Sequence, residues 1–187
     1  LPYYSQNPMQ ALAVWQGGMS FHGGLLGVTL AMIWFARRHK LELLRLSDLV
    51  SCAVPLGLFF GRIANFINGE LYGRTADLPW AFVFPHGGPL PRHPSQLYEA
   101  ALEGIVLFAL LAWLAWRRGA LQRPGLLTGI YLCGYALARA LVELVRQPDI
   151  QIGHLPFGTT MGQWLSLPML LGGLYLIWRA RRYSPGT

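Results

Sequence analysis

The residues of this sequence best suited to chemistry directly follow a long apolar run. Residues 46–60 are largely apolar and are followed by Arg62, Asn65, Asn68 and Glu70. On a helix, residues three or four apart are neighbours, so Arg62, Asn65 and either Asn68 or Gly69 share one face. An arginine deep in a membrane is costly unless it faces a partner or a water-filled cavity. An arginine that only snorkels to the membrane surface would not need two asparagines beside it, so we expect a polar site here.

A second series of polar residues recurs at helical spacing further along the chain. Its members lie four residues apart, with the last one three residues further on: Tyr131, Tyr135, Arg139, Glu143 and Arg146. This spacing places all of them on one helical face, where Glu143 can hold Arg139 through charge-assisted hydrogen bonds. An arginine–glutamate pair at this spacing is often only structural, but two tyrosines in line with it favour a lined cavity.

A third candidate is His22, which precedes two glycines in an apolar segment. Imidazole titrates near neutral pH, so His22 is either a proton acceptor or a histidine bonded between helices. At a rise of about 1.5 Å per residue, His22, Arg62 and Arg139 lie about 21–22 Å from the expected cytoplasmic ends of their helices. Scattered residues have no reason to agree in depth, so we predict one polar site inside a helix bundle. Two arginines without metal ligands suit the phosphodiester of a membrane lipid, because guanidinium binds phosphate with two parallel hydrogen bonds.

The elements that must position these residues are apolar helices. Of the 187 residues, 53% are hydrophobic and 12% are charged, which is too apolar for an ordinary soluble domain. We expect an all-α, polytopic integral membrane bundle that forms a single membrane domain over residues 1–187, with residues 69–95 as a periplasmic loop between its second and third helices. Five segments are close to the about 20 residues that span a bilayer: 17–36, 47–67, 96–116, 125–145 and 161–178.

The basic residues predict the orientation of this bundle. The net charge is +7, and cytoplasmic loops of membrane proteins carry an excess of lysine and arginine. We therefore expect a membrane protein with a cytoplasmic C-terminus, a site open to the opposite face of the membrane and no nucleic acid partner. Ten of the 15 lysine and arginine residues fall in segments on one side: Arg37, Arg38, Lys40, Arg45, Arg117, Arg118, Arg123, Arg179, Arg181 and Arg182.

The loop of residues 69–95 is rich in proline and glycine. A connection of this length without secondary structure is usually functional, and short strands are expected around residues 80–84. His93 and Glu99 are expected to contact the loop, and Glu99 is also a candidate partner for the arginines, as is Glu70. Ser95 is expected to cap the helix that follows.

Residues 61–73 resemble the signature of the bacterial prolipoprotein diacylglyceryl transferases. Similar stretches begin at His22 (HGGLLG) and His93 (HPSQLYE) and cover residues 135–146, so the resemblance extends over nearly the whole chain. Members of that family begin with about two further transmembrane helices, and the chain is therefore expected to be N-terminally truncated. Every fixed position of the signature is filled: Gly61, Arg62, Asn65, Phe66, Asn68, Glu70 and Gly73.

The resemblance implies a reaction. Enzymes of this family transfer the diacylglyceryl group of phosphatidylglycerol to the lipobox cysteine of prolipoprotein signal peptides, forming a thioether and releasing glycerol phosphate. Arg62 and Arg139 would stabilise the leaving phosphate, and either His22 or the same arginines would favour the thiolate. No metal or cofactor is expected. The residues expected to bind phosphatidylglycerol are Arg62, Asn65, Asn68, Glu70, Tyr135, Glu143 and Arg146.

Two other classes of function remain open at this point. One is an anion transporter lined by the same arginines, although the inner halves of the helices are almost uniformly apolar and argue against a continuous pathway. The other is a lipid-binding fragment that keeps the site without the catalytic activity.

Overall fold

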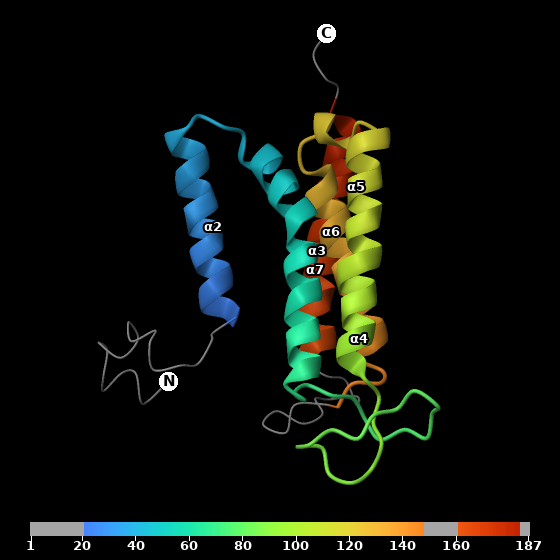
Figure 1. Cartoon of the computed structure of the whole chain (residues 1–187). Helices are drawn as coiled ribbons and strands as arrows, with labels where there is room; N and C mark the ends of the chain where they lie inside the picture. The colour runs from blue at the N-terminus through green and yellow to red at the C-terminus, as the bar shows by residue number, and fades with distance from the viewer. Residues whose placement is uncertain (1–20, 148–160, 184–187) are drawn as a thin grey trace, which may run out of the picture. The chain divides into compact units, whose positions relative to one another are not determined.

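The computed structural model describes residues 21–147 and 161–183, and the regular structure of these residues is helical apart from isolated β-bridges. The predicted all-α class is therefore confirmed. In chain order (Figure 1), the elements are α2 (Phe21–Arg38), α3 (Leu43–Ile67), α4 (Ser95–Glu99), the π-helix η3 (Ala100–Val106), α5 (Leu107–Arg117), the 3-10 turn η4 (Ala120–Gln122), α6 (Leu126–Val142) and α7 (Met161–Arg182).

The chain divides into two compact units, Leu1–Leu43 and Leu44–Thr187. The first contains α2, and the second contains α3 with Arg62 and the polar residues that follow it. A single membrane domain over the whole chain stays a prediction.

Two stretches of described helix are long and apolar enough to cross a membrane. They are α3, with 25 residues, and the continuous helix Ser95–Arg117, with 23 residues. Helix α6 is also apolar but has 17 residues. Five membrane-spanning helices therefore stay a prediction.

The helices of the second unit pack around a small apolar core. Its buried members are Leu107 and Leu111 of α5, Ala120 of η4 and Leu127 of α6. Within this unit, the C-terminal ends of α5 and α7 lie at the end opposite to the loop that joins α3 to α4 (Figure 1). The antiparallel helices thereby separate the basic ends of α5 and α7 from this loop.

The helix from Ser95 to Arg117 is not a regular α-helix throughout. Its middle section, Ala100–Val106, is a π-helix, a rare element that is frequent at functional sites. Here it meets α3 closely, because a Cβ atom added to Gly104 would lie 2.8 Å from Cβ and 3.1 Å from Cα of Phe59. Glycine at this position allows the backbones of the two helices to approach each other.

A buried carboxylate fixes the opposite end of α3 to the start of α6. Asp48 is 1% exposed. It accepts hydrogen bonds from the backbone N–H groups of Gly125 and Thr128, at 2.8 and 2.7 Å, and from the Thr128 hydroxyl at 2.7 Å. The first backbone N–H groups of a helix lack partners within that helix. Asp48 therefore caps α6 from another helix, an arrangement that the sequence did not reveal.

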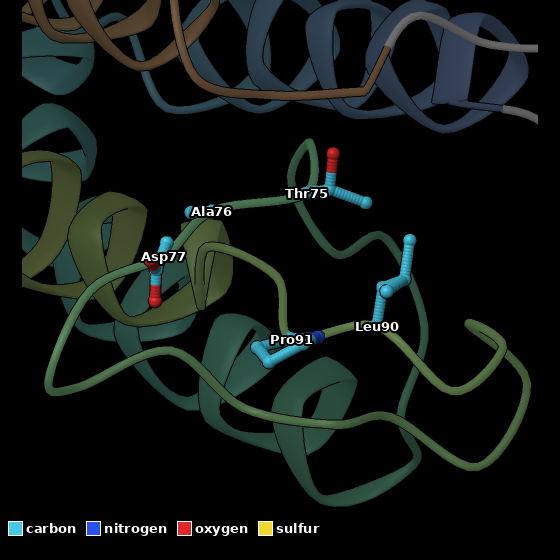
Figure 2. Close-up of a pocket in the computed structure, with 5 residues that line it drawn as sticks. All are labelled: Thr75, Ala76, Asp77, Leu90 and Pro91. Carbon is cyan, nitrogen blue, oxygen red and sulfur yellow. The ribbon is translucent and has the colours of Figure 1, made fainter.

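The loop between α3 and α4 is held by isolated β-bridges. The strands expected around residues 80–84 are reduced to a bridge between Phe82 and Arg92, and another bridge joins Gly73 to Arg146. The capping prediction for Ser95 is wrong, because its hydroxyl donates to the Leu71 carbonyl at 3.0 Å and not to the helix it begins. The loop also forms a pocket of about 360 Å³ (Figure 2), lined by Thr75, Ala76, Asp77, Leu90 and Pro91.

Candidate functional site

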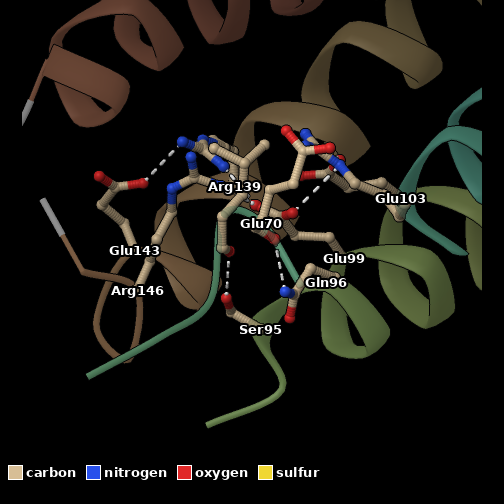
Figure 3. Close-up of polar contacts among 10 residues, drawn as sticks. Glu70, Ser95, Gln96, Glu99, Glu103, Arg139, Glu143 and Arg146 are labelled. Atoms are coloured by element: carbon tan, nitrogen blue, oxygen red, sulfur yellow. Dashed lines mark hydrogen bonds and ion pairs between the residues drawn. The ribbon is translucent and has the colours of Figure 1, made fainter. Parts of the chain in front are cut away.

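Three arginines converge on one buried glutamate near the loop end of the second unit. Glu99 of α4 is fully buried. Its Oε2 lies 3.1 Å from Nε of Arg62, and its Oε1 lies 3.0 Å from Nη1 of Arg146 and also contacts Nη1 of Arg139 (Figure 3). Arg62 and Arg139 thus meet at a shared carboxylate, whereas the common membrane depth expected for them and His22 stays a prediction.

Two further glutamates complete the cluster. Glu143 Oε2 lies 3.1 Å from Nη2 of Arg139, as the spacing of four residues predicted. Glu103 Oε2 lies 3.5 Å from Nη2 of Arg62. The resulting group, with three positive and three negative side chains, is termed the arginine cluster and consists of Arg62, Glu99, Glu103, Arg139, Glu143 and Arg146.

The ends of several helices bring these charges together. Arg62 lies near the C-terminal end of α3, and Arg139 lies in the last turn of α6, where the helix dipole favours a cation. Glu99 and Glu103 are four residues apart in the same continuous helix, so their side chains lie on one face of it. Removing one partner of a buried ion pair typically costs about 3–5 kcal/mol, because the other charge stays buried without compensation. The six residues are therefore strongly interdependent.

The loop between α3 and α4 is tied to the cluster by hydrogen bonds. Gln96, which is fully buried, donates from Nε2 to the Glu70 carbonyl at 2.6 Å (Figure 3). Arg74 donates from Nε to the Arg146 carbonyl at 3.0 Å. Gly73 pairs with Arg146 in a β-bridge. The segments that follow α3 and α6 are thus joined beside the cluster.

Some predicted site residues do not belong to the arginine cluster. Asn68 and Glu70 are exposed, and Asn68 Nδ2 donates to Glu70 Oε1 at 2.8 Å, so the Glu70 carboxylate pairs with an amide where we expected an arginine. Asn65 is half-buried. Tyr135 is half-buried too, lies beside Tyr131 and packs against the apolar core. Their roles toward a substrate stay predictions.

The two residues expected to contact the loop differ in position. His93 is half-buried, and its Nδ1 lies 3.3 Å from the Tyr98 hydroxyl, which also accepts a hydrogen bond from Trp80. Glu99, in contrast, is the centre of the arginine cluster. Its side chain is therefore a partner of the arginines, as one of the two expectations for Glu99 stated.

His22 begins the helical region of the first unit, and its side chain lies outside the described residues. Its predicted role as a proton acceptor stays a prediction.

Sequence reasoning assigned no role in the site to three buried polar residues, two beside the arginine cluster and one at the other end of α3. Glu103 and Gln96 are each 0% exposed, and Asp48 is 1% exposed. For two of them, the spacing in the sequence was the available signal. Glu103 follows Glu99 by four residues, and Gln96 precedes Glu99 by three, in an otherwise apolar helix. Asp48 gave a weaker signal, as an isolated acid in the apolar segment before Arg62.

The cluster offers guanidinium groups to an anion and no ligand set for a metal. Within the described ranges, no group of three or more histidine, cysteine, aspartate or glutamate residues could hold a metal ion. Guanidinium groups in a water-poor site bind carboxylates and phosphates in a fixed planar geometry. The site is therefore suited to an anionic group presented from the membrane.

Comparison with known proteins agrees with this chemistry. The sequence model of the prolipoprotein diacylglyceryl transferase family matches residues 1–179. The chain belongs to this family. It is 63% identical over 177 residues to a phosphatidylglycerol–prolipoprotein diacylglyceryl transferase of Rhizobium meliloti (strain 1021), an alignment that covers 94% of this chain and 63% of that protein.

Other relatives carry the same description. The chain is 60% identical over 183 residues to the protein of Rhodospirillum centenum (96% of this chain, 66% of that protein) and 55% identical over 181 residues to that of Brucella anthropi (96% and 64%). The chain spans just under two thirds of the length of these prolipoprotein diacylglyceryl transferases. Within the family's signature, Arg62 enters the arginine cluster directly, and Gly73 supports it through the bridge to Arg146.

Proposed function

We propose that this protein transfers the diacylglyceryl group of phosphatidylglycerol to the cysteine thiol of a prolipoprotein signal peptide. The observation that carries the proposal is the convergence of Arg62, Arg139 and Arg146 on the buried carboxylate of Glu99. Membership of the family supports the choice of substrates, since the relatives are named for phosphatidylglycerol and prolipoprotein.

The reaction needs positive charge where the phosphate departs. A thiolate attacks the glyceryl carbon, a carbon–sulfur bond forms, and the electron pair of the broken carbon–oxygen bond stays on the phosphate. The thiolate is required because the thiol is a poor nucleophile. Guanidinium groups fixed by buried carboxylates stabilise the developing charge without having to reorganise during the reaction.

Differences in exposure support the roles that we propose within the arginine cluster. The side chains of Arg62 and Arg139 are 16% exposed and that of Arg146 is 8% exposed, whereas Glu99 is fully buried. Arg62 and Arg139 are therefore the headgroup ligands, and Glu99 holds them from behind. Glu143 and Arg146 support Arg139 and Glu99. Four further residues contribute to the lipid site: Asn65, Asn68, Glu70 and Tyr135.

The proton of the attacking thiol is assigned to His22. This assignment rests on the ordinary titration range of imidazole and on the estimated depth of His22 in a membrane-spanning helix.

The protein is assigned to the bacterial inner membrane, with several membrane-spanning helices and a site that opens to the periplasm. The basic residues at the ends of α5 and α7 lie opposite the loop between α3 and α4, which supports a cytoplasmic C-terminus and a periplasmic loop. The arginine cluster is near the loop end, where a periplasmic peptide and an outer-leaflet lipid would meet.

The test is Arg62→Lys in the intact protein, assayed with phosphatidylglycerol and a lipobox peptide. Lysine keeps the charge but loses the planar fork that binds phosphate, so we expect most of the transfer activity to be lost while membrane insertion is unchanged. Arg123→Lys, at an exposed arginine in the segment between α5 and α6, is the matched control. Near-normal transfer by Arg62→Lys would contradict the role of Arg62 as a phosphate ligand, and absence of transfer by the unsubstituted intact protein would contradict the proposed function. Lipid binding without transfer by the unsubstituted protein would instead support a non-catalytic lipid-binding role.

A further inference from the structure

The arginine cluster has no net charge when all six of its side chains are ionised. Its three arginines are balanced by Glu99, Glu103 and Glu143, of which none is more than 5% exposed. A phosphodiester brings one negative charge into this balanced group. Charge buried without compensation is expensive, so binding of the anion requires either an added positive charge or the loss of a negative one.

Glu103 is the least compensated carboxylate of the cluster. Glu99 contacts three guanidinium groups, and Glu143 contacts Arg139 at 3.1 Å. Among the described residues, Glu103 forms an ion pair with Arg62 alone, at a long distance of 3.5 Å to Nη2. Each of the three carboxylates has one buried oxygen without a hydrogen-bond partner among these residues, so the long ion-pair distance is what distinguishes Glu103. Protonating Glu103 therefore loses less ion-pair energy than protonating Glu99 or Glu143.

The same carboxylate competes with a phosphate for Arg62. Arg62 uses Nε toward Glu99 and Nη2 toward Glu103. A bidentate phosphate contact takes two of the N–H groups of the guanidinium fork. Because the Glu99 contact is short and supported by two other arginines, the contact to Glu103 is the one that a phosphate displaces.

We propose that Glu103 takes up one proton when an anionic lipid headgroup binds to Arg62. The uptake removes one negative charge as the phosphodiester adds one, so the buried cluster stays neutral. The proton comes from the acid form of the buffer, which becomes its base form, and no other covalent bond is made or broken. This inference rests on the proposed function of the same site, and it gives Glu103 the role of a counter-ion that releases Arg62 to the substrate.

The surroundings of Glu103 agree with a proton-binding role. Arg62 of α3 faces it, Glu99 precedes it by one turn, and α6 brings Arg139, Tyr131 and Tyr135 within electrostatic range. Arg62 and Arg139 also pair with other carboxylates, and Glu99 carries the same negative charge as Glu103. Headgroup binding draws Arg62 away from Glu103 and leaves the repulsion from Glu99 uncompensated, which favours protonation.

The experiment measures protons taken up on lipid binding. The intact protein in phosphatidylcholine nanodiscs is titrated with short-chain phosphatidylglycerol by calorimetry in buffers of different ionisation enthalpy, from about pH 6 to pH 9, a range above the reference pKa of a glutamate. We expect uptake of up to one proton per lipid and an affinity that falls by up to about tenfold per pH unit where uptake is complete. A parallel titration with inorganic phosphate distinguishes a lipid headgroup from free phosphate, and we expect binding of the lipid alone.

The variant Glu103→Gln mimics the protonated state. We expect it to bind phosphatidylglycerol without proton uptake, with an affinity that does not change over this pH range and exceeds that of the unsubstituted protein at the upper end. Asp77→Asn removes an exposed acid of the loop and serves as the matched control, with proton uptake unchanged.

Different results would overturn different conclusions. Lipid binding by the unsubstituted protein without proton uptake overturns the role of Glu103, even if Glu103→Gln fails to fold. Unchanged proton uptake by a folded Glu103→Gln variant overturns it as well. In both cases the proposed transferase function stands. Absence of phosphatidylglycerol binding at every pH overturns the proposed function together with this inference.

Discussion

The close approach of α3 to the π-helix at Gly104 leads to a prediction with a defined magnitude. In Gly104→Ala, the new Cβ would lie 2.8 Å from Cβ of Phe59 and 3.1 Å from its Cα. Non-bonded carbon atoms prefer about 3.5–4.0 Å, so the two helices must separate by about 1 Å. Neither contact is with the far end of a flexible side chain, which means that a rotamer change of Phe59 cannot relieve them.

The separation acts directly on the arginine cluster, because Gly104 adjoins Glu103 and Phe59 lies three residues before Arg62. A shift of about 1 Å would lengthen the 3.1 Å contact that fixes Arg62 to Glu99 to about 4 Å, beyond hydrogen-bond range. Overpacking costs about 1–3 kcal/mol of stability, and misplacement of a catalytic group by about 1 Å can reduce turnover about 10²-fold. We expect Gly104→Ala to lose stability and turnover by amounts of this order.

The assay compares Gly104→Ala with Gly57→Ala by transfer to a lipobox peptide and by thermal unfolding in detergent. Gly57 lies in α3, and a Cβ added there would meet nothing within 4 Å. The control should keep its activity and be as stable as the unsubstituted protein, or slightly more stable, because alanine favours a helix. If Gly104→Ala is as active as Gly57→Ala, the helix approach at this position does not position Arg62 and the reasoning fails.

Three further predictions follow from the packing and the charge distribution. Asp48→Ala removes a cap made from another helix and leaves buried N–H groups without partners, so we expect a loss of about 1–3 kcal/mol in thermal unfolding experiments, whereas Asp77→Asn should have little effect. Gly73→Ala should detach the loop of the second unit, because its Cβ would lie 2.6 Å from a backbone oxygen, and limited proteolysis should then cut this loop faster. In intact spheroplasts, an impermeant maleimide should label Ala76→Cys and leave Thr187→Cys unlabelled.

Each of these has a result that would contradict it. An Asp48→Ala variant as stable as Asp77→Asn would mean that water satisfies the start of α6. Unchanged proteolysis of Gly73→Ala would show that the loop tolerates the shift. The reverse labelling pattern, with Thr187→Cys modified and Ala76→Cys protected, would invert the proposed topology.

The sequence by itself determined the helical segments and the pairings within one helix. Apolar segments of about 20 residues indicate helices directly. The observed bounds of α3, at 43–67, and of the helix at 95–117 lie close to the expected bounds of 47–67 and 96–116. The pair of Arg139 and Glu143 was also accessible, because residues four apart on a helix must be neighbours. Local periodicity carries this information and needs no knowledge of the tertiary fold.

Only the tertiary structure decided which charges share a partner. Arg139 and Glu99 are 40 positions apart, and Arg62 and Glu103 are 41 apart. At such separations, helix packing sets the partner, and the sequence left Glu70 and Glu99 as equal candidates. The π-helix and the glycine contact at Gly104 bring α3 close enough for Glu99 to become the shared carboxylate.

The cap that Asp48 provides for α6 is a second contact that the sequence alone did not determine. An acid in an apolar segment is costly without partners, and this made Asp48 conspicuous without showing where it would bond. Its partners are the free N–H groups at the start of α6, 77 and 80 positions further along the chain. A helix start always offers such donors, but only the packing of α3 against α6 determines which buried acid meets them.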